Sequence, residues 1–359
     1  MVGTYIIAEA GVNHNGDIQI AKKLIDIAVK AKADAVKFQT FKTENVISTH
    51  APKAEYQIQM TGEEESQFEM VKKLELSFLH FKELKNYCDK KGIEFLSTPF
   101  DMESADFLLN DLMLKTIKIP SGELTNAPLL LHISKKKPQI ILSTGMATLS
   151  EVEAALGVIA FGLLQREEVP SIDLFKESFI SSEGQKALKE YVTLLHCTTE
   201  YPAPVQDVNL LVMNTMSLAF GLPSGYSDHT EGIAIPIAAT ALGATLIEKH
   251  ITFDKDAEGP DHKASLSPDE LIQMVLSIRQ VEKAKGISVK IPTESEMKNI
   301  DVARKSIVAK REIKKGEKLT SENITIKRPG SGISPFNYWE VLGSVADKDF
   351  NTDEEIKIL

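Results

Sequence analysis

Short apolar runs recur along the first 255 residues, and each one leads into residues that can take part in chemistry. Eight runs are typical of buried strands, and they span residues 5–8, 35–36, 94–96, 116–117, 139–142, 192–195, 223–226 and 244–247. The residues that follow them are Glu9, Lys37, Ser97 and Thr98, Lys118, Ser143, His196, Ser227 to His229, and Glu248 to His250. In a closed (β/α)8 barrel, the carboxyl ends of all strands meet at one mouth, where such enzymes place their active sites. The pattern therefore predicts an α/β fold of the TIM-barrel type together with the location of its site.

Helical periodicity fills the segments between these runs. Asp17 suits a helix N-cap, and Ile20 and Leu24 follow it at helical spacing. Ser267 and Pro268 form a similar start signal, because proline is favoured in the first turn. Further helices are predicted over residues 77–91, 102–109, 149–159, 232–242 and 267–285. Strict alternation of strands and helices predicts a parallel sheet, and eight repeats favour a closed barrel over an open doubly wound sheet.

Two insertions interrupt this alternation. Residues 43–73 form a long polar stretch that follows the second strand, at the expected mouth of the barrel. This position suggests a lid or a substrate-facing loop, although a plain surface excursion fits almost as well. Residues 165–184 are acidic and polar, and we assign no function to them.

The character of the chain changes after Gly286. Residues 287–299 contain Pro292 and several charges, which is typical of a linker. Residues 306–310 alternate like a strand, and Gly316 lies in a turn-like sequence. We therefore expect a catalytic barrel over residues 1–286, a linker over 287–299, and a small second domain of short strands and turns over 300–359.

Composition narrows the functional classes. The net charge is 41 − 51 = −10, which argues against general nucleic-acid binding but not against an anionic substrate held by local lysines. Only two cysteines occur, Cys88 and Cys197, so a disulfide framework is not expected and a reducing cytoplasm fits. We also expect no signal peptide and no membrane span, since the apolar runs are much shorter than the ~20 residues a spanning helix needs.

His229 and His250 are the strongest metal candidates in the chain. They follow adjacent predicted strands, so both rings can point into one site, and two imidazoles with open positions suit a divalent catalytic ion. The alternative is a pair of histidines that are hydrogen-bonded at a barrel rim. Glu9, Glu123 and Asp261 add carboxylates on neighbouring loops, where they can bind metal, orient ligands or move protons.

Lys37 and Lys118 also end predicted strands, and an unpaired ammonium near a packed barrel interior is costly. An anion should therefore neutralise them. Hydroxyl donors that surround the same mouth are Thr98, Ser121, Ser143 and Ser227. This composition is typical of a phosphate or phosphoenolate pocket. Salt bridges to Glu9 and Glu123 without any ligand are one alternative, and a lysine Schiff base is another. Nothing in the sequence matches the nucleotide-binding pattern GxxxxGK[ST], so we infer no nucleotide cofactor.

Together, these residues resemble the sialic acid synthases, a family that includes legionaminate and pseudaminate synthases. The segments that carry the resemblance occur in family order, and they are Glu9 to Gly16, Val36 to Thr40, Ser97 to Phe100, Lys118 to Glu123, Leu142 to Met146, His196 to Thr198, Tyr201-Pro202, Ser227 to Thr230, Glu248 to His250 and Gly259 to Asp261. The tail is similar to the antifreeze-like, or SAF, domain of that family, especially at Lys327 to Gly332.

The resemblance implies that phosphoenolpyruvate condenses with the open-chain aldehyde of an N-acetylated amino sugar, giving a nonulosonic acid and phosphate. Residues implied to hold phosphoenolpyruvate are Lys37, Thr98, Lys118, Ser121, Ser143 and Ser227. His229 and His250 are implied to hold Mn²⁺ or Mg²⁺, which polarises the aldehyde oxygen. Glu9 or Glu123 then helps water to add to the carbon that bears the phosphate. Residues implied to contact the sugar are Gln39, Thr199, Tyr201, Asp261 and Arg328. The family often has asparagine where this chain has Thr199, which puts one sugar contact in doubt.

The resemblance leaves the sugar open. N-acetylmannosamine gives N-acetylneuraminate, whereas a 2,4-diacetamido-trideoxy sugar gives a legionaminate or a pseudaminate. The family also implies a domain-swapped homodimer, in which the tail of one chain brings Arg328 to the barrel of the other. Two further classes stay open at this point, namely a metal-dependent barrel aldolase that releases pyruvate, and a protein whose tail binds ice or glycans.

Overall fold

The computed structural model describes residues 3–55, 57–58 and 65–357 of the chain. The chain divides into two compact units, Met1–Gly286 and Ile287–Leu359. Within the described ranges, none of the helices has the length and apolar character needed to cross a lipid bilayer.

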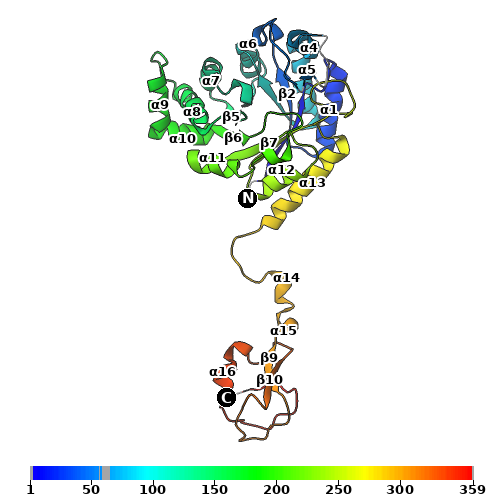
Figure 1. Cartoon of the computed structure of the whole chain (residues 1–359), viewed down its shortest axis with the longest axis vertical. Helices are drawn as coiled ribbons and strands as arrows, with labels where there is room; N and C mark the ends of the chain where they lie inside the picture. Colours follow the sequence, from blue (N-terminus) through cyan, green and yellow to red (C-terminus); the bar gives the residue numbers. More distant parts are fainter. Residues whose placement is uncertain (1–2, 56, 59–64, 358–359) are drawn as a thin grey trace. The chain divides into compact units, whose positions relative to one another are not determined.

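The first unit is built on eight parallel strands (Figure 1). Their bounds are β1 Tyr5–Gly11, β2 Ala35–Thr40, β3 Glu94–Pro99, β4 Thr116–Ile119, β5 Gln139–Ser143, β6 Val192–His196, β7 Ser224–Asp228 and β8 Leu246–His250. The pairing order is β3-β2-β1-β8-β7-β6-β5-β4, and the two end strands, β3 and β4, also lie in contact. The sheet is therefore a near-closed TIM-like barrel, which confirms the fold that the apolar runs predict.

Helices connect the strands and cover the outside of the barrel. Their bounds are α1 Ile18–Ala31, α2 Thr43–Val46, α4 Gln67–Leu74, α5 Phe78–Lys91, α6 Met102–Asp106, α7 Ala127–Ser134, α8 Leu149–Leu163, α9 Ile172–Ile180, α10 Ser182–Tyr191, α11 Val212–Phe220, α12 Ala234–Ala241 and α13 Pro268–Lys285. Short 3-10 helices cover Ser121–Glu123 and Val205–Asp207. The predicted helix over 102–109 ends earlier, because α6 passes into a π-helical turn at Phe107–Asp111.

The predicted helix starts are present. The Asp17 side chain accepts a hydrogen bond from the amide of Gln19 and caps α1. Ser267 and Glu270 form a reciprocal capping box at the start of α13, with Pro268 as its first residue. The acidic insertion over 165–184 contains α9 and the start of α10.

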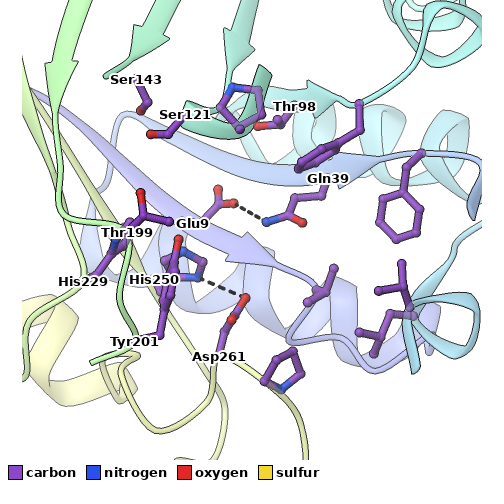
Figure 2. A pocket seen from close by; sticks show the side chains of 18 of the residues that line it. Glu9, Gln39, Thr98, Ser121, Ser143, Thr199, Tyr201, His229, His250 and Asp261 are labelled. Atoms are coloured by element: carbon purple, nitrogen blue, oxygen red, sulfur yellow. Dashed lines mark hydrogen bonds and ion pairs between the residues drawn. The ribbon is translucent and has the colours of Figure 1, made fainter. Parts of the chain in front are cut away.

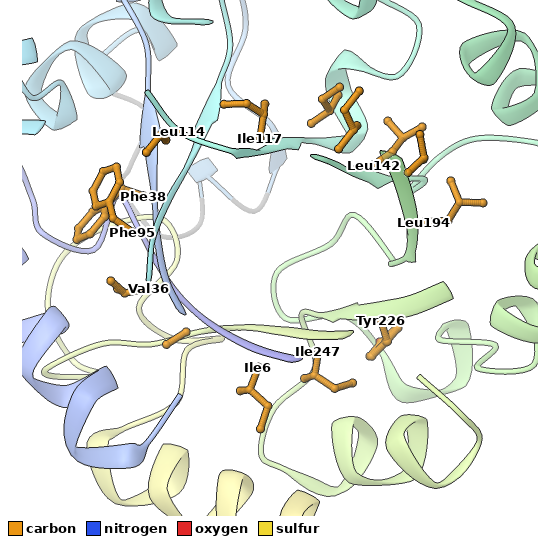
Figure 3. Packing of buried hydrophobic residues seen from close by; sticks show 14 of the residues in the cluster. Ile6, Val36, Phe38, Phe95, Leu114, Ile117, Leu142, Leu194, Tyr226 and Ile247 are labelled. Atoms are coloured by element: carbon orange, nitrogen blue, oxygen red, sulfur yellow. The ribbon is translucent and has the colours of Figure 1, made fainter. Parts of the chain in front are cut away.

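Side chains of successive strand residues alternate between two hydrophobic cores. The larger core lies between barrel and helices, and Figure 3 shows members such as Ile6, Val36 and Ile247 on the outer side of their strands. A smaller core fills the barrel interior, and its buried members are Ile7, Ala35, Leu96, Ile141, Leu195 and Leu246. The residue that lies two positions after each of these core members also points into the barrel, because side chains alternate along a strand. The polar residues singled out in the sequence therefore form a layer directly above the apolar plug.

The second unit is described by itself. Its elements are α14 Glu294–Met297, α15 Ile300–Ala303, β9 Ser306–Ala309, β10 Ile324–Lys327, a 3-10 helix Pro335–Asn337 and α16 Tyr338–Val341. The two strands pair antiparallel, and their buried side chains Ile307, Ala309 and Ile324 belong to a small core of their own. Gly316 adopts φ +87° in the predicted turn, a conformation that favours glycine. A single helical turn, α14, lies within the stretch predicted as a linker.

Candidate active site

A cavity of about 350 Å³ opens at the carboxyl end of the barrel strands. It falls within the size range of small-molecule sites. Predicted site residues that line it are Glu9, Lys37, Gln39, Thr98, Lys118, Ser121, Ser143, Thr199, Tyr201, Ser227, His229, His250 and Asp261. Figure 2 shows Thr98, Ser121 and Ser143 on one side of Glu9, with His229, His250, Tyr201 and Asp261 on the other. The barrel thus brings together side chains that are spread over more than 250 positions of sequence.

Four buried charges occupy the floor of this cavity. Lys37 Nζ lies 2.6 Å from a carboxylate oxygen of Glu9 and 3.7 Å from one of Glu248. Lys118 Nζ lies 3.1 Å from the other carboxylate oxygen of Glu248. All four side chains are at most 4% exposed. Two ammonium and two carboxylate groups therefore neutralise one another in a region that water barely reaches.

The two carboxylates of this cluster differ in acidity. Burial raises the pKa of Glu9, and the neighbouring Glu248 raises it further, against the attraction of Lys37. Burial alone would also raise the pKa of Glu248, but Lys118 and Lys37 outweigh it and hold that pKa well below its usual range. Glu248 therefore keeps its charge, whereas Glu9 can gain or lose a proton at moderate pH. Such a separation of pKa values suits a pair in which Glu9 moves protons while Glu248 stays ionised beside it.

Hydroxyl groups surround the lysines. Thr98 accepts a hydrogen bond from Lys37 at 3.0 Å, and Ser227 donates one to Glu248 at 2.9 Å. The hydroxyls of Ser143 and Thr199 are buried without a hydrogen-bond partner among the described residues. Because an unpaired buried hydroxyl is costly, these two atoms indicate that a polar ligand completes their hydrogen bonds. Ser121 lies at the edge of the group, where it accepts a hydrogen bond from the amide of Gly145.

His229 and His250 lie side by side, with ring centroids 5.6 Å apart. The Nδ1 atom of His229 lies 2.6 Å from the carbonyl oxygen of Thr198. Since a carbonyl only accepts, Nδ1 carries the proton and Nε2 keeps its lone pair. Burial lowers the pKa of His229 to about 4 and that of His250 well below its usual value, so both rings are neutral at pH 7.

These two histidines fit a divalent metal. A histidine must be neutral to bind a metal, and the Nδ1 of His250 is buried without a hydrogen-bond partner in the described part of the chain. The carboxylate of Asp261 lies 3.9 Å from that atom, and burial raises the pKa of Asp261 to about 6. Among the described residues, no cluster of three or more potential ligands is preformed. Two imidazoles with further coordination positions open would suit a catalytic ion.

A second buried ion pair lies behind the histidines, on the outer side of the strands. Lys249 Nζ lies 2.6 Å from Asp228, and both side chains are fully buried. Lys249 also donates to the carbonyl oxygen of Thr230, while Asp228 accepts from the amide of Thr230 at 3.0 Å. The pair thus closes the turn that carries His229 and joins it to β8, the strand that carries His250.

Two predicted site residues are not among the residues of the described cavity lining. Glu123 belongs to the 3-10 helix after β4, where it accepts a hydrogen bond from Asn126, and the described cavity lining does not include it. Arg328 lies in the second unit, where its Nε donates to the carbonyl oxygen of Ala303. Conversely, sequence reasoning assigned no role to Glu248, although it lies in a quoted motif. Its signal was present, since it precedes His250 by two residues and therefore faces the same side of β8.

Comparison with known proteins agrees with this geometry. A model of the NeuB family matches residues 24–290, and a model of the SAF domain matches residues 304–357. The chain is 53% identical over 357 residues to the N,N'-diacetyllegionaminic acid synthase of Campylobacter jejuni, covering 99% of this chain and 100% of that protein. It is 45% identical over 340 residues to the protein of the same name from Legionella pneumophila, covering 95% of this chain and 89% of that one.

A solved structure shares both the fold and the family. The N-acetylneuraminic acid synthetase of Leptospira borgpetersenii, solved in complex with citrate, is 33% identical, with a TM-score of 0.66, over 83% of this chain and 90% of that chain. The sequence resemblance, the barrel with its SAF domain and these relatives lead to the same result. The chain belongs to the NeuB family of synthases.

Proposed function

We propose that this protein is an N,N'-diacetyllegionaminic acid synthase. The observation that carries the choice of product is the 53% identity, over the whole length of both chains, to the Campylobacter protein of that name. The reaction is the family's condensation of phosphoenolpyruvate with an N-acetylated amino sugar, in which water adds and phosphate leaves. For the proposed product, the sugar is a 2,4-diacetamido-trideoxy sugar.

Phosphoenolpyruvate is proposed to bind on the buried floor of the cavity. Lys37 and Lys118 supply positive charge, and four hydroxyl groups, from Thr98, Ser121, Ser143 and Ser227, supply further donors. The support is the unpartnered hydroxyl of Ser143 together with the dense charge of the floor. Charged hydrogen bonds in such a shielded place are stronger than neutral ones, so they can repay the loss of water around a phosphate.

Synthases of this family generally depend on a metal, and we propose that His229 and His250 hold Mn²⁺ or Mg²⁺ here. When bound, the ion supplies a Lewis acid for the aldehyde oxygen of the sugar. The protein orients both imidazoles through Thr198 and the Lys249–Asp228 pair.

Glu9 is proposed to activate the water that adds to the carbon bearing the phosphate. Its raised pKa makes it a better base than an ordinary carboxylate, and Glu248 stays charged beside it. Glu123, the other sequence candidate, is a weaker choice because of its position after β4. Gln39, Thr199, Tyr201 and Asp261 are proposed to contact the sugar from the cavity walls.

The proposed product predicts a substrate preference of the wild-type enzyme. With phosphoenolpyruvate and Mn²⁺ supplied, phosphate release should be faster with the 2,4-diacetamido-trideoxy sugar than with N-acetylmannosamine, by at least tenfold in kcat/KM. A coupled phosphate assay over both sugars measures this preference, with mass spectrometry of the product as a check. A preference for N-acetylmannosamine contradicts the proposed product and leaves a neuraminate synthase.

We further propose a domain-swapped homodimer in the cytoplasm, in which Arg328 of one chain contacts the sugar in the barrel of the other. The planar guanidinium suits an acetyl carbonyl or a sugar hydroxyl. The support is the SAF domain together with the exposure of Arg328, which leaves most of its donors for a ligand. The thiols of Cys88 and Cys197 are free and buried, which suits a reducing compartment.

Mixing two inactive variants tests the swap. Chains with Arg328→Ala and chains with Lys118→Met should each turn over poorly, whereas an exchanged mixture should recover activity. Half of the dimers in an equal mixture are hybrids with one intact site, so about a quarter of wild-type activity is expected. Arg311→Ala, on the same unit, is the matched control. An exchanged mixture without recovery, with exchange verified by mass, contradicts a contact between chains.

A further inference from the structure

The cavity has a second half that the reaction described so far does not use. Apolar side chains line it, and we call six of them, which form one packed cluster, the apolar arm: Val12, Phe41, Val46, Val71, Leu74 and Phe100. Val12, Phe41 and Phe100 come directly after β1, β2 and β3, the strands that carry Glu9, Lys37 and Thr98. The other three lie on α2 and α4: Val46 and Val71 belong to the insertion over 43–73, of which residues 56 and 59–64 lie outside the described part, and Leu74 comes directly after it.

The side chains of the apolar arm pack against one another and form one wall of the cavity. Val12, Phe41 and Leu74 are buried, and the rings of Phe41 and Phe100 pack edge to face with centroids 6.2 Å apart. Glu75, at the end of α4, accepts hydrogen bonds from the amide and the hydroxyl of Thr43 at 3.1 and 2.9 Å. These bonds fasten the end of α4 to the first residue of α2. The wall is therefore fixed in place over the polar floor.

The polar floor limits where the sugar can extend. The reacting aldehyde of the sugar must lie between the two histidines and the lysines that are proposed to hold phosphoenolpyruvate. With that region occupied, the remaining carbons of the sugar extend into the other half of the same cavity. Their substituents then meet the apolar arm, whose six side chains offer neither a donor nor an acceptor.

We propose that the apolar arm selects the sugar, by receiving the terminal methyl group and the distal acetamido methyl group of a 2,4-diacetamido-trideoxy sugar. This inference rests on the proposed function and names the residues that set its substrate. N-acetylmannosamine carries hydroxyl groups at the corresponding positions, and the six apolar side chains of the arm offer these groups no hydrogen-bond partner in exchange for the water they lose. One methylene group that fills an apolar pocket changes the ratio of kcat/KM between two substrates by roughly ten- to two-hundredfold.

An acetamido group also needs a polar partner, and the arm has one at its edge. Gln57 and Gln67 line the same cavity, and the Gln67 amide donates to the Gln57 carbonyl oxygen at 3.3 Å. Two side-chain amides beside an apolar wall match a group that is itself an amide with a methyl on one end. A sugar with only hydroxyl groups at these positions can form hydrogen bonds with the two amides, but it has no methyl group to pack against the apolar arm.

Val71→Thr tests the arm, because threonine has the shape of valine and adds one hydroxyl group to the wall. The ratio of kcat/KM for the diacetamido sugar to that for N-acetylmannosamine should fall about tenfold, while KM for phosphoenolpyruvate stays within twofold. Val46→Thr, on α2, should lower the same ratio. It tests the arm if Val71→Thr does not fold. Val29→Thr, on the outer helix α1 and likewise partly buried, is the matched control and should leave the ratio unchanged.

The outcomes separate this inference from the proposed function. A wild-type enzyme that prefers N-acetylmannosamine overturns the proposed product. A wild-type enzyme that prefers the diacetamido sugar, with a ratio unaltered in folded Val71→Thr and Val46→Thr, keeps the proposed product and overturns the role of the arm. A fall in the ratio in the arm variants, but not in Val29→Thr, supports both.

Discussion

Replacing His250 with alanine is expected to abolish specific Mn²⁺ binding and to reduce turnover by more than about a hundredfold. The ring lies 5.6 Å from that of His229 and is held neutral by burial, so its loss leaves a single imidazole at the site. One nitrogen ligand cannot retain the ion against water. Calorimetric titration with Mn²⁺ measures the affinity, and the phosphate assay measures turnover before and after chelator treatment.

Stability must be followed in the same samples, because His250 ends β8 in the middle of the sheet. A thermal melt separates a folded variant without metal from an unfolded one, and His250→Gln keeps most of the side-chain volume. His132→Ala is the control, since that histidine lies on α7 and pairs with Asp106. Wild-type turnover in excess chelator, or unchanged Mn²⁺ affinity in folded His250→Ala, contradicts the metal role.

Replacing Lys118 with methionine should mainly impair the use of phosphoenolpyruvate. A charged hydrogen bond in a shielded pocket contributes about 1.5–3 kcal/mol, which corresponds to a rise in KM of roughly ten- to a hundredfold. Glu248 keeps its contacts with Ser227 and Lys37, so the cluster retains partners for its carboxylate. Initial rates at varied phosphoenolpyruvate, with the sugar saturating, measure the change.

The contrasting interpretation is that Lys118 only neutralises Glu248. In that case Lys118→Met lowers the melting temperature, but the folded enzyme keeps its KM for phosphoenolpyruvate. Lys23→Met, an exposed lysine on α1, shows the effect of removing a positive charge far from the cavity. A rise in KM that is specific to Lys118→Met supports the anion pocket.

Alternation along the strands explains why so much of the site follows from sequence. Leu246, Glu248 and His250 share the inner face of β8, and Ile7 and Glu9 share that of β1. The alternation of side chains with a period of two residues, and the polar residue that ends an apolar run, are local properties of the chain. They can therefore be recognised from the sequence alone. The same rule places Glu248 inside the barrel, two residues before His250 on the same face of β8, although the sequence prediction gave it no role.

Other features depend on long-range geometry. The local sequence does not show where the side chain of Glu123 points, and the turn after β4 directs it to Asn126 and away from the described cavity lining. The apolar arm joins residues after three strands with residues of α2 and α4, so it exists only once the barrel has formed. The pKa separation of Glu9 and Glu248 likewise follows from burial among four charges, which no sequence pattern encodes.

The buried pair Lys249–Asp228 constrains how this chain can change over evolutionary time. Losing one partner leaves an uncompensated buried charge, at a cost of about 3–5 kcal/mol, whereas replacing both with well-packed apolar residues is often neutral. Single substitutions at either position therefore pass through a strongly disfavoured intermediate. Although 21 positions separate them in the chain, the two residues form one inherited unit, and relatives should keep both charges or exchange both together.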